Sequence, residues 1–423
     1  MSTSVAIVGT GYVGLTTGAC LAHLGHRVVC ADIDPDRVHT LQGGSVPFYE
    51  PGLAELVAEG TSSGRLRFVL GGAAAAADAD LVFLCVPTPQ ADDGSVDLSY
   101  VENAARSIAA ALRPGAVVVN KSTVPVGSAA IVERIIDRDD VSVVSNPEFL
   151  REGSAVSDFL HPDRVVIGAD SAEAGRRVAA LYQSVEAPVL VTDPASAETI
   201  KYAANAFLAT KISFVNAIAA VCEAVGADII DVVRGLGLDR RIGSEFLRPG
   251  PGWGGSCFPK DTRALVAIAE SGGYDFKLLR GVIDSNAEQQ ARMLAKVRDA
   301  LGGELAGATI AAWGLAFKAN TDDVRDSPAV SIVESLVAAG ACVRAYDPQA
   351  TVALPGVEQV PSALDACDGA DVLVVLTEWP EFIGADLGGV AARLRRRAVV
   401  DTRNVLDPGE AGRVGLRLIG VGR

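Results

Sequence analysis

The sequence predicts an α/β protein in which two Rossmann-like, doubly wound domains are joined by a long central helix. Apolar strands alternate with helical segments at both ends of the chain, a glycine-rich turn follows the first strand, and apolar residues recur through several helical turns over 197–225. A chain of 423 residues accommodates two or three domains. We expect an N-terminal α/β domain over 1–195, a helical linker and dimerisation domain over 196–305, and a C-terminal α/β domain over 306–423.

The N-terminal domain opens with a strand, a glycine turn and a helix. Residues 4–8 read as a buried strand, Gly9-Thr10-Gly11-Tyr12-Val13-Gly14 follow, and a helix continues to His23. A second strand, 27–31, ends at Asp32, which lies 18 residues beyond Gly14, where an acid that binds a ribose is expected. A lone glycine motif is weak evidence, but these flanking elements favour a dinucleotide site.

Further strands at 81–86, 117–120 and 141–144 alternate with helices and predict a parallel sheet. Ligands of such sheets bind beyond the carboxyl ends of the strands. The loops 87–89, 122–125 and 146–148 are therefore candidate walls of a site.

The C-terminal part repeats this pattern. Residues 79–84 are echoed by 370–375, and 27–32 by 343–347. This predicts a second α/β domain from about Ala306, with its first strand at 309–313. Because the turn at 314–318 lacks the three glycines, we expect it to bind something other than the dinucleotide.

Composition and charge narrow the class of protein. Hydrophobic residues make up 49% of the chain and charged residues 21%, which excludes a disordered protein, and a net charge of −15 argues against nucleic-acid or anionic-membrane partners. No segment has the features of a signal peptide, and none reaches the roughly 18 uninterrupted apolar residues of a membrane span. Seven scattered cysteines show neither a disulfide framework nor the spacing of a zinc site. We expect a soluble, cytoplasmic protein with reduced thiols and no metal.

Cys257 has the surroundings of a nucleophile. A glycine-rich turn, 252–256, precedes it, and Pro259, Lys260 and Asp261 follow. The other cysteines lie in apolar runs or have few polar neighbours, so we expect small buried hydrophobic residues at Cys20, Cys30, Cys85, Cys222, Cys342 and Cys367.

Three pairs of polar residues lie four positions apart: Glu148 with Glu152, Lys201 with Asn205, and Cys257 with Asp261. On a helix each pair would share a face. Pro147 and Pro259 predict helix starts, which would place Glu148 and Cys257 near helix N-termini, where the dipole favours a thiolate or an oxyanion.

Lys201 has two interpretations. In a largely apolar helix it is either a snorkelling surface lysine or a buried one with a lowered pKa that acts as a base or steadies an alkoxide together with Asn205. All four histidines lie in the N-terminal half, and we expect solvated or capping roles for them. Acid–base chemistry then falls to Lys201, Asp261 and the glutamates.

Several long motifs occur in one order along the whole chain. They are 9–14, Glu50-Pro51-Gly52-Leu53, 122–127, 146–153, 252–261 and 317–326. With these motifs the chain resembles the UDP-glucose/GDP-mannose dehydrogenase family, and within it the members that oxidise UDP-glucose.

The resemblance implies a four-electron, NAD-dependent oxidation of UDP-glucose to UDP-glucuronate through a thiohemiacetal and a thioester. By that resemblance Cys257 is the nucleophile, Lys201 and Asn205 stabilise oxyanions, Asp261 and Thr123 hold a catalytic water, and Glu148 assists thioester hydrolysis. Two NAD are used per sugar. The resemblance also implies a homodimer in which Arg241 reaches in from the partner subunit.

The remaining binding residues are likewise implied by the resemblance. For NAD they are Gly9, Gly11, Tyr12, Val13, Gly14, Asp32, Arg37, Thr88, Thr123, Glu152, Lys260 and Arg325, and the Asp32 carboxylate would repel the 2′-phosphate of NADP. The C-terminal domain is implied to bind the UDP-sugar, although Arg403 taken alone reads as ordinary surface charge. The implied substrate residues are Phe149, Leu150, Arg151, Glu152, Lys201, Asn205, Arg241, Phe246, Leu247, Arg248, Gly252, Trp253, Gly254, Phe317, Lys318 and Arg403.

Three alternatives stay open. Trp253 stands where the family pattern has a smaller aromatic residue, which leaves the loop shape and the sugar preference open. GDP-mannose is the alternative substrate, although the segments 240–243 and 321–328 favour UDP-glucose. A two-electron hydroxy acid dehydrogenase would share the cofactor motif but would need no Cys257. A catalytically silent NAD-binding scaffold is disfavoured because the cysteine, lysine and acid positions are all filled.

Overall fold

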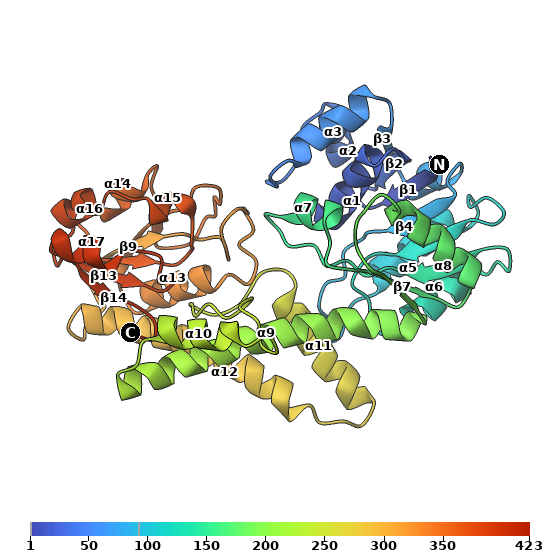
Figure 1. Cartoon of the computed structure of the whole chain (residues 1–423). Coiled ribbons are helices and arrows are strands. Elements are labelled where there is room, and N and C mark those ends of the chain that lie inside the picture. Colours follow the sequence, from blue (N-terminus) through green and yellow to red (C-terminus); the bar gives the residue numbers. More distant parts are fainter. Residues whose placement is uncertain (1, 92–93) are drawn as a thin grey trace. The chain divides into compact units, whose positions relative to one another are not determined.

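The structure, a computed structural model, describes residues 2–91 and 94–423. The chain forms two compact units (Figure 1). The first runs to Ala204 and includes Arg263–Gly272, and the second comprises Asn205–Thr262 and Gly273–Arg423. The predicted three-part division at 1–195, 196–305 and 306–423 stays a prediction.

The first unit is built on an eight-stranded sheet with the order β3-β2-β1-β4-β5-β6-β7-β8. This order is that of a doubly wound fold extended at one edge, as predicted. One step differs from the predicted parallel sheet, because β6 and β7 pair antiparallel, a reversal that alternation of strands and helices does not encode. The strands are β1 Ser4–Val8, β2 Arg27–Asp32, β3 Leu66–Leu70, β4 Leu81–Leu84, β5 Val117–Asn120, β6 Ser142–Ser145, β7 Val165–Ala169 and β8 Val189–Thr192.

Two hydrophobic cores cover the two faces of this sheet. Alternate residues of β1 divide between them, with Val5 and Ile7 in one core and Ala6 and Val8 in the other. Truncating the fully buried Ile7 to Ala would cost about 2–5 kcal/mol. The helices are α1 Tyr12–His23, α2 Pro35–Gln42, α3 Leu53–Ser62, α4 Gly72–Ala76, α5 Ser99–Ala109, α6 Ser128–Ile136, α7 Ala155–Leu160 and α8 Ala172–Ala179, with a 3-10 turn η1 Ala180–Tyr182.

The second unit contains a six-stranded sheet with the order β11-β10-β9-β12-β13-β14. Every strand pair is parallel, and the order repeats that of the first six strands of the other sheet. The predicted internal repeat is therefore confirmed. Its elements are β9 Thr309–Trp313, α13 Pro328–Ala338, β10 Cys342–Tyr346, β11 Val357–Gln359, α14 Ala363–Cys367, β12 Val372–Val375, α15 Pro380–Ile383, α16 Leu387–Arg393, β13 Ala398–Asp401, α17 Pro408–Arg413 and β14 Arg417–Ile419.

Four helices lie between the sheets in sequence: α9 Pro194–Val225, α10 Ile229–Leu238, α11 Phe258–Ser271 and α12 Lys277–Ala300. The long helix predicted over 197–225 is α9. Asp193 accepts the Ser196 N–H at 2.8 Å just before its start, and Gly226 follows its end with φ +73°. In the second unit α12 packs against α13 and β13.

By length and composition alone, α9 is apolar enough to cross a membrane. Its polar side chains argue for a place within the fold. Lys201 pairs with Glu148 inside the first unit, and Asn205, Ser213 and Asn216 make hydrogen bonds inside the second.

The cysteines follow the prediction with one exception. Cys20, Cys30, Cys85, Cys222 and Cys367 are buried, whereas Cys342 is exposed. Cys342 is the first residue of β10, where the side chain points away from the core that its neighbour Val343 enters, so its prediction as a buried residue was wrong.

Candidate active site

The glycine turn between β1 and α1 tolerates no larger residue at two positions. Gly9 has φ +98°, and a Cβ there would lie 2.5 Å from the Cys85 carbonyl oxygen. A Cβ on Gly14 would lie 1.9 Å from the Gly9 carbonyl oxygen. A Cβ at Gly11 would meet nothing within 4 Å, which leaves the backbone before α1 open to approach by a ligand. This arrangement fits the phosphates of a dinucleotide at a helix N-terminus.

Asp32 ends β2 beside this turn. Its carboxylate accepts the Thr10 N–H at 2.8 Å and the Thr10 hydroxyl at 2.7 Å, and Arg37 lies 3.9 Å away. Burial by itself raises the pKa of Asp32, but the bonds from Thr10 and Asp34 and the charge of Arg37 outweigh it and lower that pKa. Asp32 therefore carries a negative charge at neutral pH, as a ribose-binding acid requires. Thr88 lies half-buried in the loop after β4.

Tyr12 and Val13 begin α1, and Tyr12 connects the turn to the segment that follows β6. The Tyr12 hydroxyl donates to Glu50, whose carboxylate also accepts the N–H groups of Gly153 at 2.6 Å and Ala155 at 2.7 Å. Glu50 belongs to the Glu50–Leu53 motif, for whose residues no individual role was predicted. Reasoning from sequence missed this residue, because the two backbone N–H groups that it binds are more than 100 positions away.

Glu148 and Lys201 form a buried ion pair in the first unit. Lys201 Nζ lies 2.9 Å from Glu148 Oε1, and both side chains are only 4% exposed. Of the two interpretations of Lys201, the structure therefore favours the buried one. Burial alone raises the pKa of Glu148, but Lys201, the Leu150 N–H and Lys121 together lower it.

The predicted helix start at Pro147 is wrong. Residues 146–150 are irregular, and the next helix, α7, begins only at Ala155. The Glu148 carboxylate accepts the N–H of Leu150 at 2.6 Å and Gly153 has φ +80°, so the chain turns locally instead of continuing a helix. Glu148 and Glu152 consequently share no helical face.

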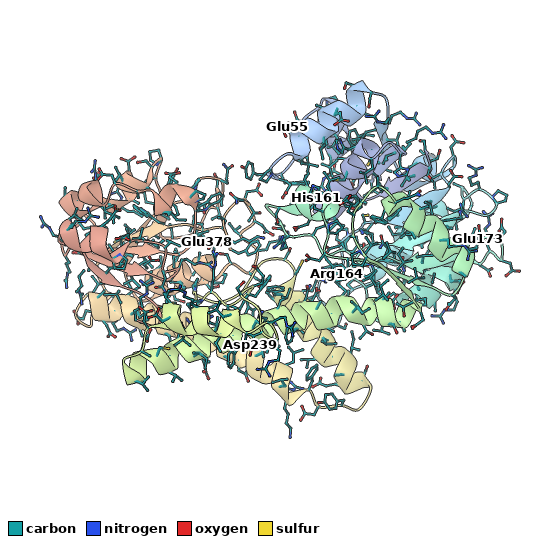
Figure 2. All side chains as sticks on the ribbon, viewed as in Figure 1. Glu55, His161, Arg164, Glu173, Asp239 and Glu378 are labelled. Carbon is teal, nitrogen blue, oxygen red and sulfur yellow. The ribbon has the colours of Figure 1, made fainter. Side chains whose placement is uncertain are left out.

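Phe149 lies beside this ion pair. Its ring packs under the Arg164 guanidinium at 3.7 Å, and Lys201 Nζ lies 5.5 Å from the ring centre. Figure 2 labels Arg164. Leu150 is half-buried, and Arg151 is exposed and paired with Asp158 at 2.6 Å.

Thr123 lines a small cavity of about 10 Å³ in the same unit, which is the space that one water molecule needs. Lys201 and Glu198, one turn apart on α9, also line it. Glu198 accepts the Gly127 N–H at 2.6 Å and the Ser145 hydroxyl at 2.8 Å, and burial raises its pKa. Sequence reasoning missed Glu198. The sequence does contain a signal for it, because an acidic residue three positions before Lys201 is unusual in a largely apolar helix.

Asn205, Asp261 and Lys260 form a second cluster, in the second unit. Asn205 Nδ2 donates to Asp261 Oδ2 at 2.6 Å, and Lys260 Nζ donates to Asp261 Oδ1 at 2.7 Å. Asp261 is fully buried. Both of its oxygens therefore have a donor, and the contact between Asn205 and Asp261 joins one member of each of two predicted pairs.

Cys257 immediately precedes α11, so the expected helix start near Pro259 is confirmed. The Asp261 N–H donates to the Cys257 carbonyl at 2.8 Å, which is the first helical bond. The thiol is half-buried, and its Sγ lies 3.6 Å from Ser256 Oγ. Its place at the positive end of a helix favours the thiolate form.

The loop before Cys257 is held by amide side chains. Asn286 Oδ1 accepts the Trp253 N–H at 2.8 Å while its Nδ2 donates to the Trp253 carbonyl at 2.9 Å. The Trp253 indole N–H donates to Ser213 at 2.9 Å, which accommodates the larger aromatic residue. A Cβ on Gly252 would lie 2.8 Å from Asn286 Oδ1, and one on Gly254 would lie 2.0 Å from the Asp326 carbonyl oxygen. Sequence reasoning missed Asn286.

Earlier in this segment, Phe246 has φ +60°, and its ring centre lies 6.4 Å from that of Phe258 with the two rings tilted by 56°. Leu247 is buried and Arg248 is exposed.

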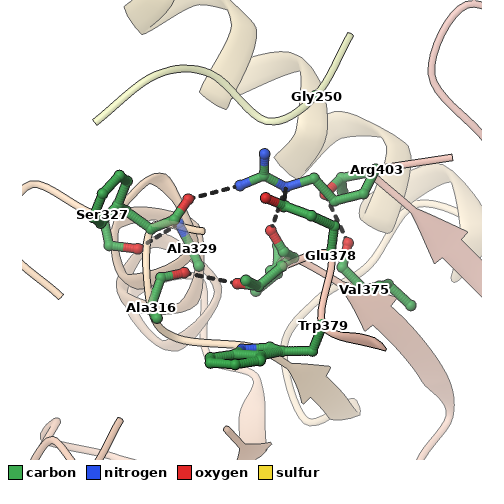
Figure 3. A network of polar contacts seen from close by, with 12 residues as sticks. Gly250, Ala316, Ser327, Ala329, Val375, Glu378, Trp379 and Arg403 are labelled. Atoms are coloured by element: carbon green, nitrogen blue, oxygen red, sulfur yellow. Dashed lines mark hydrogen bonds and ion pairs between the residues drawn. The ribbon is translucent and has the colours of Figure 1, made fainter. Parts of the chain in front are cut away.

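Arg403 lies in the turn that follows β13 of the second sheet. Only 16% exposed, it donates to the carbonyl oxygens of Leu376 at 2.8 Å and Phe317 at 2.9 Å and pairs with Glu378 at 3.1 Å (Figure 3). The interpretation as ordinary surface charge is therefore wrong for Arg403. Gly255 packs against Phe317, and Lys318 Nζ lies 5.5 Å from the Phe317 ring centre. The structure thus gathers Phe317, Lys318 and Arg403 near the loop before Cys257.

Two other implied residues form ion pairs with nearby acids, and a third is half-buried. Arg241, whose side chain is 86% exposed, pairs with Asp239, which Figure 2 labels. Arg325 pairs with Asp323 at 2.6 Å. Glu152 is half-buried after the Glu148 loop. Within residues 2–91 and 94–423, no three His, Cys, Asp or Glu side chains are grouped as metal ligands.

Comparison with known proteins agrees with this geometry. Three parts of the UDP-glucose/GDP-mannose dehydrogenase family match the chain: its NAD-binding domain matches residues 3–186, its central domain 195–288 and its UDP-binding domain 311–408. The UDP-glucose 6-dehydrogenase of Rhizobium meliloti (strain 1021) is 46% identical over 433 residues, which cover 99% of each chain. A second, from Bacillus subtilis (strain 168), is 46% identical over 99% of this chain and 93% of its own.

A solved structure has the same fold. The UDP-glucose dehydrogenase from Pyrobaculum islandicum superposes with a TM-score of 0.92 at 40% identity, covering 100% of this chain and 98% of its own. The chain therefore belongs to the UDP-glucose/GDP-mannose dehydrogenase family.

Proposed function

We propose that this chain is an NAD-dependent enzyme that oxidises UDP-glucose twice at C6 and releases UDP-glucuronate. The observation that carries the proposal is Cys257 at the start of α11, one turn before the buried Asp261 and its partners Asn205 and Lys260, in a chain that also carries a dinucleotide turn. A single oxidation of an alcohol needs no such thiol. The names of the relatives support UDP-glucose as the substrate.

The cofactor fits the first unit. The glycine turn lets the backbone approach the phosphates, and the Asp32 carboxylate would accept hydrogen bonds from the adenosine ribose. When bound, NAD accepts a hydride from C6 in each of the two oxidations.

Cys257 separates the two oxidations. C6 loses a hydride and its hydroxyl loses a proton to give an aldehyde. The thiolate adds to this aldehyde, and the oxygen takes up a proton as the thiohemiacetal forms. Loss of a second hydride and of that proton leaves a thioester. Lys201 and Asn205, one turn apart on α9, are proposed to stabilise the negative charge that develops on the C6 oxygen.

Water then releases the product. It adds to the thioester carbon, the C–S bond breaks, and Cys257 leaves as the thiolate. We propose that Thr123 and Asp261 hold this water and that the ionised Glu148 accepts its proton. Overall, UDP-glucose, two NAD⁺ and one water give UDP-glucuronate, two NADH and three protons.

We propose that each of the three predicted domains has its own role. Residues 1–195 bind NAD, residues 196–305 form the dimer interface and residues 306–423 bind the UDP-sugar. A stripe of exposed apolar residues on α9 supports a homodimer. Its members, spaced by seven, seven and four positions, are Phe207, Phe214, Val221 and Val225. The exposure of Arg241 suits a residue that reaches a partner's site. None of the seven cysteines forms a disulfide, which supports a reducing, cytoplasmic location.

The experiment that tests the function is the ratio of NADH formed to UDP-glucose consumed. We expect two, with UDP-glucuronate as the product. A ratio of one with free aldehyde would contradict the four-electron oxidation and favour a simple alcohol dehydrogenase. Faster turnover of GDP-mannose in the same assay would instead keep the chemistry and change the substrate.

A further inference from the structure

Lys121, directly after β5, is a buried cation that the proposed chemistry does not use. Its residue is 5% exposed, and its Nζ donates to Asn146 Oδ1 at 3.1 Å and to the Tyr182 hydroxyl at 3.3 Å. Within the described part of the chain no carboxylate forms an ion pair with it. Burying an ammonium group against neutral partners is costly, and such arrangements concentrate at functional sites.

Asn146 makes this lysine part of a fixed network. Its Oδ1 accepts both Lys121 and the Tyr182 hydroxyl, the latter at 2.7 Å, and its Nδ2 donates to the Val166 carbonyl at 2.7 Å. Its backbone N–H donates to the Asn120 carbonyl at 2.9 Å. The network leaves Asn146 one available side-chain orientation.

The network joins the two loops that carry the proposed hydrolytic residues of the first unit. Lys121 lies two positions before Thr123, and Asn146 lies two positions before Glu148. The strands that precede these loops, β5 and β6, are paired in register with Asn120 opposite Ser145. The Lys121–Asn146 hydrogen bond therefore connects the first residues of the two loops, and both of these residues are buried.

Lys121 also contributes to the charge around Glu148. The groups that face Glu148 are Lys201 from α9, Lys121 from the end of β5 and the Leu150 N–H of its own loop. Both cations lower the pKa of Glu148.

Lys121 is positively charged at neutral pH, as Lys201 is in its ion pair with Glu148. Burial lowers the pKa of Lys121 to about 8, while Cys85 and Glu148 act to raise it and Lys201 to lower it. Burial raises the pKa of Cys85 to about 12 and also raises that of Tyr182, so both are neutral at pH 7. At neutral pH the Glu148 carboxylate therefore has two cations nearby: Lys201, which contacts it, and Lys121, which acts on it through its charge.

We propose that Lys121 is a positioning residue for thioester hydrolysis: through Asn146 it aligns the Glu148 loop with the Thr123 loop, and its charge supports the Glu148 carboxylate. This inference rests on the proposed function, because it concerns the last step of that reaction. The two oxidations do not require Lys121, so its loss should slow release of the acid and leave formation of the thioester intact.

Three variants separate charge from hydrogen bonding. Lys121→Met removes both, Lys121→Gln retains a donor for Asn146 without the charge, and Tyr182→Phe removes one hydroxyl and keeps the lysine. We expect both Lys121 variants to give a burst of two NADH per active site followed by turnover at least about tenfold slower than wild type. The covalent sugar thioester should accumulate on the intact protein, visible by mass spectrometry.

The pH dependence of kcat distinguishes a charge effect of Lys121 from a purely structural role, because a structural role would leave the pH profile unchanged. Because the cation lowers the pKa of Glu148, its removal should move the acid limb of the kcat profile to higher pH in both Lys121 variants, whereas Tyr182→Phe should keep the wild-type limb. KM for NAD should be unchanged in all three.

The outcomes are distinct. Wild-type turnover and pH profile in folded Lys121→Gln would overturn the proposal, and so would failure of both Lys121 variants to fold, since Lys121 would then serve the fold alone. If the wild-type enzyme itself forms only one NADH per UDP-glucose, the proposed function fails independently of Lys121.

Discussion

Cys257 differs from the other cysteines in its surroundings. Burial raises the pKa of Cys20, Cys85 and Cys367 to about 12, which keeps them protonated and inert. Cys257 instead stands half-buried at the start of a 14-residue helix, where the helix dipole favours a negative charge. A thiol in that position has the chemistry of a nucleophile.

We expect Cys257→Ser to reduce steady-state turnover by about a thousandfold or more, because a hydroxyl is a far weaker nucleophile than a thiolate. The measurement is NADH formation with UDP-glucose, together with the intact mass of the variant, on which a stalled sugar ester would appear. Cys342→Ser, at the exposed thiol of β10, is the matched control and should behave as wild type. Turnover by Cys257→Ser equal to that of the control would show Cys257 to be structural.

Asp32 permits a test of cofactor choice that changes charge while keeping shape. We expect Asp32→Asn to narrow the preference for NAD over NADP by about tenfold or more, because the variant still has an oxygen to accept from Thr10 but no charge to repel a 2′-phosphate. Arg37, 3.9 Å from Asp32, would then be available to that phosphate. The ratio of kcat/KM values for the two cofactors measures the effect.

Asp347→Asn is the control for this change, since Asp347 follows β10 in the second sheet as Asp32 ends β2 in the first. Its ratio should stay at the wild-type value. An unchanged ratio in Asp32→Asn would mean that Asp32 does not face the adenosine ribose.

At the scale of elements, sequence periodicity predicted the long helix and the strands that it named, but it did not identify β3, β7, β8, β11, β13 or β14. Val117–Asn120 and Thr309–Trp313 have the bounds that their apolar runs indicated, because a buried strand must be apolar along its whole length. The helix predicted to start at Pro147 is absent, because Glu148 instead accepts the Leu150 N–H in a local turn and pairs with Lys201, 53 positions away. Asn205 and Asp261 are separated by 56 positions, and no local pattern records that their side chains touch.

The loop before Cys257 shows how one element supports another. Asn286 of α12 exchanges two hydrogen bonds with the Trp253 backbone, as a neighbouring strand would, and Gln289, one turn on, donates to the Gly250 carbonyl at 2.8 Å. Trp253 itself is 6% exposed. The loop is therefore held in place by the helix side chains.

We expect Asn286→Leu to raise KM for UDP-glucose by about tenfold and to leave KM for NAD unchanged. The variant keeps the approximate volume of the side chain but leaves the Trp253 N–H and carbonyl buried without partners, which costs about 1–3 kcal/mol for each group. Initial-rate kinetics with each substrate varied in turn provide the measurement. Asn286→Asp, which can still accept the Trp253 N–H, should show a smaller effect, and a selective loss of NAD affinity in either variant would contradict the assignment of this loop to the sugar nucleotide.

At the scale of the whole molecule, the two sheets share one strand order but differ at equivalent acids. The Asp32 carboxylate accepts from Thr10 and Asp34, whereas the Asp347 carboxylate accepts the N–H groups of Leu315 at 2.7 Å and Ala316 at 3.0 Å, those of Gln349 and Ala350, and the Trp379 indole N–H. Both carboxylate oxygens of Asp347 thus already accept hydrogen bonds from residues of its own domain. This gives a physical reason why the repeated fold need not repeat the dinucleotide site.

The apolar stripe of α9 carries the last prediction, which concerns assembly. Phe207, Phe214, Val221 and Val225 are 64%, 52%, 54% and 70% exposed, although apolar side chains of this size are normally covered. Their spacing of seven, seven and four positions places them on one face of the helix, as in a helix that packs against a second helix. A second copy of the chain, which offers the same stripe, would cover it with twofold symmetry.

We expect the wild-type protein to sediment as a dimer and Phe214→Asp to weaken the association by about thirtyfold or more, because a carboxylate would be buried opposite its symmetry mate. Sedimentation at several protein concentrations measures the dissociation constant. Ile383→Asp, at a 55% exposed apolar residue of α15, is the control and should leave the association unchanged. If Arg241 completes the partner's site, Phe214→Asp should also lose activity on dilution, while the control keeps it. A wild-type monomer, or a Phe214→Asp protein that associates as tightly as the control, would contradict the assignment of this stripe to the dimer interface.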